Sequence, residues 1–251
     1  MLDNEYYKAR DIMKLLGYEK WDNFKNVIDR AQLICNISNN SVSTNFEIIK
    51  YKVDGKLIVD YKLSKYALYL ILQNADSRKK PVALLQNQFT PQINVLQNYD
   101  IGFTNLTEDE KRVYIRFNIK NKNRFLFREA KKSGVIDFSK FNDHGYMGLY
   151  NGEMAMLIAK RKELDYRNQN ILDYMGSKEL SLNLFRITQT EEALKDNYIK
   201  SENNACIVHY DTAKAVRDVS LDIYSSLPEN LPNVNEPIKK IEKRLIKELK
   251  K

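Results

Sequence analysis

The stretch YYKARDIMKLLGYEKWDNFKNVIDRAQLICN, residues 6–36, decides the fold of the first third of the chain. Its apolar side chains from Ile12 to Leu16 share one helical face, and Gly17 then ends the turn. A second apolar face recurs at helical spacing from residue 20 to residue 34. The stretch therefore predicts two helices joined at a glycine, which is a generic helix-turn-helix outline.

A β-hairpin is predicted after this helix pair, beyond a polar loop rich in Asn and Ser at residues 36–45. The sequence FEIIKYKVDGKLIVDYKL contains two β-rich runs that are separated by Asp54 and Gly55. That dipeptide readily adopts the positive φ angles of a two-residue hairpin turn. We therefore expect a hairpin at about residues 46–62.

Two more helices complete the N-terminal part. The first starts near Ser64 and is apolar enough to be the core element on which the others pack. The second runs from Pro81, a favourable residue in a first helical turn, through Ile93. Residues 98–106 have the composition of a linker, so we expect a first domain at residues 1–97.

The next segment carries a helix start signal and a high density of basic residues. Thr107 to Glu110 has the form of a capping box, and acids at this place suit a helix N-terminus. The following run alternates apolar and polar residues as a strand does, but the acids before it and the bases after it favour a long helix. Basic residues then recur every four positions and form a broad ribbon on that helix. They are Arg112, Arg116, Lys120, Arg124 and Arg128.

The middle of the chain is expected to be mainly helical. Residues 133–152 contain four glycines and are predicted to be loop or short irregular structure. Helices are predicted at about 153–163, 178–199 and 205–225, within a second domain at residues 107–227. The fold class is thus α+β, with a winged-helix-like head before a mainly α-helical C-terminal domain.

Residues 238–251 are predicted to form a basic amphipathic helix, in which Ile238, Ile241, Leu245 and Leu249 share one face. Three interpretations are open: docking to another domain or a second copy, nucleic-acid contact through the lysines, or a position on a membrane surface. Docking is favoured, because the helix lacks the Trp or Phe that interfacial helices commonly use.

The formal net charge of +8 invites an anionic partner, and its distribution is uneven. Residues 1–100 hold 14 basic and 11 acidic side chains, residues 101–237 hold 20 of each, and residues 238–251 hold 7 against 2. Within the neutral middle, residues 111–132 carry nine basic groups and one acid. Two concentrated basic segments therefore lie outside the N-terminal third.

Composition also excludes several classes of protein. Cys35 and Cys206 are the two cysteines, and the chain has no CxxC motif or Cys/His cluster, which excludes a disulfide framework and a zinc finger. The N-terminus is charged where a signal peptide is apolar, and the longest apolar run, residues 66–72, is too short to span a bilayer. We expect a cytoplasmic protein without a membrane partner, a cofactor or a metal.

The helix pair and hairpin resemble a winged arrangement, in which a helix enters the major groove of DNA and the hairpin lies along the backbone. Polar groups can face outward from the second helix, and lysines crowd the hairpin tip, where they suit phosphate. Any amphipathic helix also has a solvated face, so both interpretations stay open. In addition to the ribbon, the candidate DNA-binding residues are Arg10, Lys14, Lys20, Trp21, Asn23, Lys25, Asn26, Arg30, Lys50, Lys52 and Lys56.

Several segments resemble known families. The sequences ARDIMKLLGYEKWDNFKNVIDRA (9–31) and LSKYALYLILQNADSRKKPVALLQNQF (63–89) are similar to the BRO-type N-terminal domain of phage antirepressors. The segments 143–152, 171–194 and 228–243 resemble the DNA-damage-inducible protein D family, and the block MGSKELSLNLFRITQTE is quite specific. The resemblance covers nearly the whole chain. Such proteins usually carry a strand or hairpin before the ARD motif, whereas only about eight residues precede it here, which leaves the first strand open.

The resemblance implies a non-enzymatic DNA-binding regulator, damage-induced or linked to a prophage, that modulates RecA-dependent recombination. Its implied partners are double- or single-stranded DNA and RecA or another recombination protein, and a homo-oligomer is also open. One alternative is a partner-binding inhibitor that acts chiefly through its C-terminal domain. A weaker alternative is a metal-dependent nuclease.

The candidate groups for such a nuclease are few. Asp143 and His144 are adjacent, and adjacent side chains need not face each other, so a lone histidine is more often structural or solvated. Asp165, Asp173 and Glu179 lack the paired spacing of a metal nuclease, although a fold can gather distant carboxylates.

Two blocks of the C-terminal domain have structural and functional interpretations. DHGYMGLYNG does not fit a phosphate-binding glycine motif, which favours a tight loop anchored by Tyr146 and Tyr150. Arg186, Gln189 and Glu191 lie in the specific FRITQTE block. They indicate either a buried polar network or a partner surface.

Overall fold

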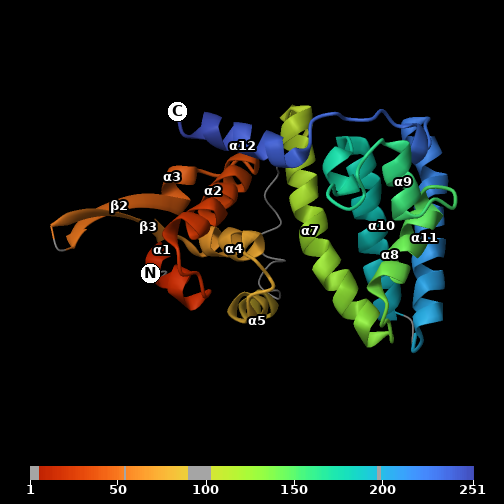
Figure 1. Ribbon diagram of the computed structural model, residues 1–251, viewed down its shortest axis with the longest axis horizontal. Helices are drawn as coiled ribbons and strands as arrows, with labels where there is room; N and C mark the ends of the chain where they lie inside the picture. The colour runs from red at the N-terminus through yellow and green to blue at the C-terminus, as the bar shows by residue number, and fades with distance from the viewer. Residues whose placement is uncertain (1–5, 54, 90–102, 197–198) are drawn as a thin grey trace. The chain divides into compact units, whose positions relative to one another are not determined.

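The chain divides into two compact units in the computed structural model (Figure 1). The first consists of residues 1–106 together with 242–251, and the second of residues 107–241. The described parts of the chain are mainly helical with one small antiparallel sheet, which confirms the α+β prediction. Within them, no helix combines the length and the apolar character needed to cross a membrane. The described residues are 6–53, 55–89, 103–196 and 199–251.

The first unit joins a sheet of strand order β1-β3-β2 to a set of helices. Its elements in chain order are β1 (Tyr7–Lys8), α1 (Ala9–Leu15), α2 (Trp21–Ile37), α3 (Val42–Asn45), β2 (Phe46–Val53), β3 (Lys56–Leu63), α4 (Lys65–Asn74), α5 (Lys80–Phe89) and the 3-10 turn η2 (Phe103–Asn105). α2 packs against α4, and Phe24, Ile28 and Ile71 are fully buried. α2 is therefore a core helix as well as a candidate DNA-binding helix.

The helix pair and the hairpin lie where the sequence predicts them. Gly17 separates α1 from α2 and has a φ of +72°, a left-handed conformation that glycine adopts without strain. The hairpin pairs Val53 with Lys56 at its outer end, and Gly55 in its turn has a φ of +77°. The two-residue strand β1 pairs with β3, so a first strand is present despite the few residues before the ARD motif.

The segment predicted as a polar loop at residues 36–45 is partly helical. α2 continues to Ile37, and α3 forms one turn before β2. The N–H of Thr44 donates to the hydroxyl of Ser41 at 3.3 Å, which satisfies one of the free donors of that turn. The loop prediction is therefore wrong at residues 36–37, which belong to α2, and at residues 42–45, which form α3. At α3, the serine cap makes a helical turn possible in a polar sequence.

The helices predicted after the hairpin are present. Ser64 caps α4 by accepting a hydrogen bond from the N–H of Ala67 at 3.0 Å. α5 begins one residue before Pro81, as expected for a proline in the first turn. The helix end predicted at Ile93 and most of the linker predicted at residues 98–106 lie outside the described residues.

The second unit is built from helices. Its elements are α7 (Glu108–Lys132), α8 (Phe138–Leu149), α9 (Ala155–Arg161), η3 (Ile171–Tyr174), α10 (Ser177–Asp196), α11 (Glu202–Tyr224), η4 (Pro228–Asn230) and the start of α12 (Ile238–Leu249). The predicted capping box is confirmed, since Glu110 and Thr107 exchange side-chain and backbone hydrogen bonds at the start of α7. α7 packs against α10, and α8 packs against α11.

The prediction of loop structure at residues 133–152 is wrong, because this segment contains α8. Two of its glycines serve close packing and not turns. A Cβ added at Gly145 would overlap buried side chains of α10 and α11, and one at Gly148 would overlap the carbonyl oxygen of Tyr210. Only glycine allows α8 to approach these helices so closely.

This close approach predicts a stability effect at one position. Replacement of Gly148 by alanine should lower the free energy of unfolding by about 1–3 kcal/mol, since the added methyl group meets backbone that cannot move aside alone. Urea unfolding followed by circular dichroism measures this loss. Gly176→Ala is the matched control, because its added Cβ would have its nearest neighbours at 3.6 and 3.7 Å. Equal stability of the two variants would contradict the packing argument.

Candidate nucleic-acid interface

The outer surface of α2 carries a stripe of exposed polar side chains. Asn23, Asn26 and Arg30 follow one another at the spacing of helical turns. Lys20 is exposed at the N-cap of the helix, and Lys14 is exposed on α1. The first turns of α2 therefore present amide and ammonium groups to solvent, while the rest of the helix is largely buried in the core.

Three other predicted residues are engaged within the first unit. The guanidinium carbon of Arg10 lies 4.1 Å from the centre of the Trp21 ring, and Arg10 Nη2 donates to the carbonyl of Val59 at 3.0 Å. Lys25 forms an ion pair with Asp29 one turn away on α2. Lys25 Nζ also lies 5.4 Å from the centre of the Tyr61 ring on β3. These contacts join α1 and α2 to β3, so Arg10, Trp21 and Lys25 support the surface on which the exposed residues lie.

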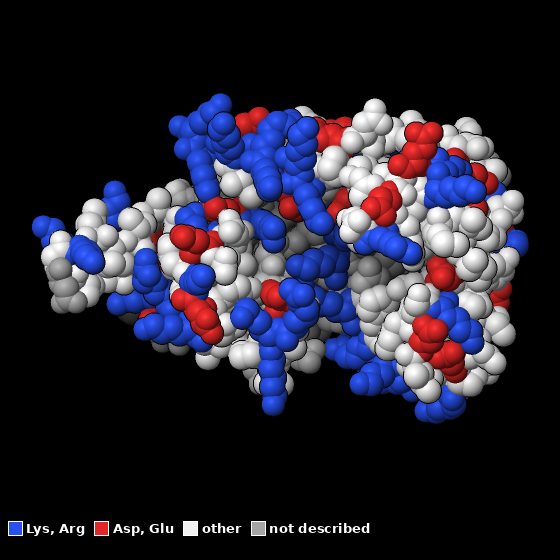
Figure 2. Space-filling view, viewed as in Figure 1, with Lys and Arg blue, Asp and Glu red and all other residues white. Residues whose placement is uncertain are grey.

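The C-terminal segment, residues 242–251, belongs to this unit and contacts α2. Lys250 Nζ lies 2.6 Å from a carboxylate oxygen of Asp29, which is buried, and Arg30 Nε lies 3.8 Å from the carboxylate of Glu242. The docking that was favoured for the terminal helix is thus present. The segment carries five basic and two acidic side chains, which doubles the basic excess of the first unit from three to six. Figure 2 shows Lys and Arg side chains gathered over α12.

The lysines of the hairpin lie on its two faces. Lys50 stands opposite Val59 and Lys52 opposite Leu57, which places both lysines on one face. Lys56 stands opposite Val53 on the other face. All three lysines are exposed, so the outer hairpin can meet anionic groups on either side.

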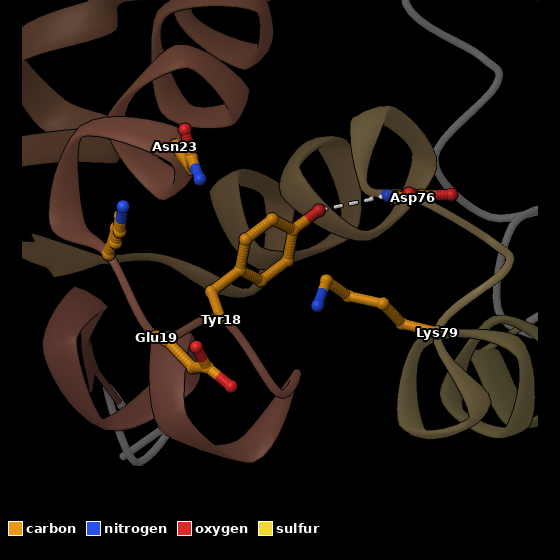
Figure 3. Close-up of a pocket in the computed structure, with 6 residues that line it drawn as sticks. Tyr18, Glu19, Asn23, Asp76 and Lys79 are labelled. Carbon is orange, nitrogen blue, oxygen red and sulfur yellow. Dashed lines mark hydrogen bonds between the residues drawn. The ribbon is translucent and has the colours of Figure 1, made fainter.

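A hollow of about 430 Å³ lies beside the turn between α1 and α2 (Figure 3). The hydroxyl of Tyr18 accepts a hydrogen bond from the backbone N–H of Asp76 at 2.9 Å, and Lys79 Nζ donates to the carbonyl of Gly17 at 2.7 Å. Hydrogen bonds from Arg78 lower the pKa of Asp76 to about 2. The hollow thus combines opposite charges, and its polar groups fix the turn that presents the start of α2. Its lining residues are Tyr18, Glu19, Lys20, Asn23, Asp76 and Lys79.

The basic ribbon predicted on α7 is wrong at Arg112. Its side chain is 1% exposed, and the guanidinium donates to the carbonyl oxygens of Met175, Asp173 and Glu236 at 2.9, 3.1 and 2.9 Å. Burial lowers the pKa of Arg112. A spacing of four residues drifts by about 40° per step around a helix, so the ribbon begins on the buried side of α7. Arg112 holds the second unit together and is not available to DNA.

The other members of the ribbon differ in exposure. Arg116 is half-buried and donates to the carboxylate of Asp173 at 2.9 Å. Lys120 and Arg128 are exposed, and Arg124 is half-buried. The candidate surface on α7 is therefore confined to its second half.

A buried polar network crosses the core of the second unit. Lys162 Nζ lies 2.8 Å from the carboxylate of Glu179, and each side chain is 1% exposed. The other carboxylate oxygen of Glu179 accepts from the hydroxyl of Tyr150 at 3.0 Å, and this hydroxyl accepts from Asn183 Nδ2 at 2.9 Å. The side-chain oxygen of Asn183 accepts from Arg186 at 3.1 Å. Each of these side chains thus makes at least one hydrogen bond inside the unit, although Nε of Arg186 is buried without a partner.

His209 joins the network as a neutral ring. Its Nδ1 lies 2.9 Å from the carbonyl oxygen of Phe141, to which it donates, and its Nε2 lies 2.9 Å from a guanidinium nitrogen of Arg186, from which it accepts. Burial and the charge of Arg186 hold the pKa of His209 well below its ordinary value. A buried polar network is thus the correct interpretation for Arg186. Glu191 is also buried but pairs with Lys195 at 2.7 Å outside this network, and Gln189 is exposed.

The carboxylates considered for a nuclease serve the fold. Asp143 accepts from the N–H of Ala155 at the start of α9 at 3.1 Å, and Asp165 accepts hydrogen bonds from its own loop. Asp173 and Glu179 are paired with basic side chains. Among the described residues, no group of three or more His, Cys, Asp or Glu side chains is placed to hold a metal ion.

Comparison with known proteins agrees with this division of the chain. Residues 106–241 match the family described as the DinD C-terminal domain, and residues 2–84 match the N-terminal domain of the BRO family. The chain is 39% identical to DNA damage-inducible protein D of Escherichia coli (strain K12) over 247 residues, which is 95% of this chain and 90% of the relative. No solved structure matches the chain.

The neutral state of His209 predicts a loss of stability in mild acid. Below pH 6.5 the unfolded chain takes up a proton on this residue that the folded protein does not, so the free energy of unfolding falls as pH is lowered. The slope from this group approaches about 1.4 kcal/mol per pH unit. Urea unfolding at pH 7.5, 6.5 and 5.5 measures it.

Comparison with His209→Gln isolates this contribution from that of other groups. The variant should lose stability at pH 7.5 but show a shallower decline between pH 6.5 and 5.5. His144→Gln retains His209 and should therefore keep its contribution to the decline. If the free energy of unfolding fell in parallel for the parent and His209→Gln as pH is lowered, the folded protein would protonate His209 as readily as the unfolded chain does.

Proposed function

Because the chain belongs to the family of DNA damage-inducible protein D, we propose that it is a DNA-binding regulator of the DNA-damage response or of a prophage. The proposal locates DNA contact in the first unit, which matches the BRO family, and expects the protein to act by binding, without catalysis, in the cytoplasm. It includes the modulation of RecA-dependent recombination, which the family resemblance implies.

The observation that carries this proposal is the surface around α2. Asn23 and Asn26 are exposed on the first turns of the helix, where a recognition helix contacts base edges. In a two-point contact, the NH2 of an asparagine amide donates to N7 of adenine and its carbonyl oxygen accepts from the N6 amino group. The C-terminal segment is fixed to the same helix through the Lys250–Asp29 pair and supplies basic groups that suit phosphates. Groups suited to base contact and groups suited to phosphate contact therefore lie on one unit, which supports the proposal.

The C-terminal segment gives the sharpest test of this interface. The double variant Lys243→Ala/Lys247→Ala should bind duplex DNA more weakly, with a salt dependence reduced by up to about 2 in the slope of log K against log salt. Both lysines are exposed, so their loss should leave folding unchanged. Fluorescence anisotropy with a labelled 25-base-pair duplex between 50 and 200 mM salt measures the slope.

Two controls separate phosphate contact from other effects. Lys160→Ala/Lys214→Ala removes the same charge from exposed positions of the second unit and should keep the parent slope. Asn23→Ala/Asn26→Ala should weaken binding to the preferred duplex while the salt slope stays the same, because amides release no counterions. Absence of binding to duplex and single-stranded DNA at 50 mM salt would refute the proposed function.

A second candidate function concerns α9 of the second unit. Met154 at the N-cap of α9 and Met156 and Leu157 in its first turn are 38%, 55% and 41% exposed, and such flexible apolar side chains suit an adaptable protein interface. We propose this surface as the place where RecA or another recombination protein binds. The chain would then act as an inhibitor chiefly through its second unit.

This candidate predicts that the two functions can be separated. Met156→Gln/Leu157→Gln should abolish capture of RecA in a pull-down and any effect on RecA strand exchange, while DNA affinity is retained. Lys243→Ala/Lys247→Ala is the reciprocal variant and should retain RecA capture. An effect on strand exchange that disappears only with the lysine variant would assign the activity to DNA contact and not to α9.

A further inference from the structure

The outer half of the β2–β3 hairpin exposes large apolar side chains. Leu57 is 60% exposed, Ile48 58% and Val53 47%, and Tyr51 and Val59 are also exposed. The fully buried residues of the hairpin lie at its base and are Phe46 on β2 and Asp60, Tyr61 and Leu63 on β3. Figure 1 shows the hairpin extending beyond the helices of its own unit. Within the described residues, both faces of this outer half expose apolar side chains, and Ile49 and Ile58 are half-buried.

The register mixes these apolar side chains with lysines in an ordered way. On one face, Lys50 and Lys52 of β2 stand directly opposite Val59 and Leu57 of β3. Paired side chains of an antiparallel ladder lie about 5 Å apart, so each lysine flanks an apolar group. On the other face Val53 stands opposite Lys56. The tip therefore presents apolar side chains on both faces, each beside an ammonium group.

Charge distinguishes between the occupants that such a surface can have. Two copies of this hairpin packed face to face would bring lysines of the same sign together, which disfavours a second copy. The lysines instead favour an anionic partner. The exposed apolar side chains favour a partner that also offers an apolar surface. A DNA duplex offers both, because its backbone is anionic and the faces of its bases are apolar once two base pairs are parted.

The dimensions of the hairpin suit this partner. The four outer pairs, from Lys50–Val59 to Val53–Lys56, extend roughly 14 Å at about 3.4 Å per residue. The two strands are about 4.8 Å apart, and a ribbon of this kind can enter a DNA groove. Proteins that insert Leu or Ile between base steps from the minor groove kink the duplex by about 20–90°.

We propose that the outer hairpin is a DNA-bending arm, in which Lys50, Lys52 and Lys56 hold phosphates and Val53 and Leu57 insert between base pairs. This inference rests on the proposed DNA binding of the first unit and adds to it the mode of contact. The arm recognises the deformability of a sequence, so it favours flexible steps such as TA. The proposal makes the apolar tip, and not only the lysines, part of the interface.

The test uses the full chain and two labelled forms of one 26-base-pair duplex with a central TA step. The first form carries a donor and an acceptor dye at its two ends and reports bending as a rise in energy transfer. The second carries 2-aminopurine at the central step and reports loss of stacking as a several-fold rise in fluorescence. Val53→Gln/Leu57→Gln should bind within about threefold of the parent affinity yet lose both signals. Leu84→Gln, which changes an equally exposed leucine on α5, should behave as the parent.

The outcomes distinguish this inference from the function on which it rests. If the parent binds the duplex without either signal, the arm is refuted and DNA binding stands. If the parent does not bind at 50 mM salt, the proposed function fails first. If sedimentation shows self-association of the parent that Val53→Gln/Leu57→Gln abolishes, while the duplex stays straight, the hairpin is an interface between copies and the arm is refuted. Circular dichroism confirms that each variant is folded.

Discussion

The requirement that a buried charge be paired decides which basic side chains of this protein remain available to a partner. Arg112 satisfies it with three carbonyl oxygens, and Lys162 with the carboxylate of Glu179. Both are part of the core as a result. In the first unit, Lys250 and Lys25 compensate the buried carboxylate of Asp29. The net charge therefore does not locate a DNA-binding surface unless these buried, paired side chains are first left out of the count.

The pairing of Asp29 also explains how α2 can be both a core helix and a candidate DNA-binding helix. α2 is buried along most of its surface, and a carboxylate buried in its middle would be costly without partners. Lys250 supplies one from the far end of the chain, and this contact brings the C-terminal segment to α2. The basic excess that the segment adds to the first unit is therefore a consequence of a structural contact with α2.

Local patterns in the sequence are sufficient for elements that depend on contacts between near neighbours and insufficient for packing across the chain. The hairpin depends on the turn at Gly55, and the start of α7 on a capping box between Thr107 and Glu110, which are contacts between near neighbours. The helical state of residues 138–149 was missed because its glycines serve a contact with Tyr210, more than sixty residues away. The burial of Arg112 depends on segments equally distant.

The same distinction applies to the hairpin. The alternation of apolar and polar residues predicts the two strands, and Lys50, Lys52 and Lys56 can be chosen from the sequence. An alternating strand, however, normally buries one of its two faces. Only the structure shows that both faces of the outer half are open at Leu57 and Val53. Lysines on an edge strand discourage pairing with another chain, which allows such apolar groups to remain exposed. The lysines that would oppose self-association of the hairpin are thus also those that would attract a polyanion, so both effects would place the same demand on the sequence.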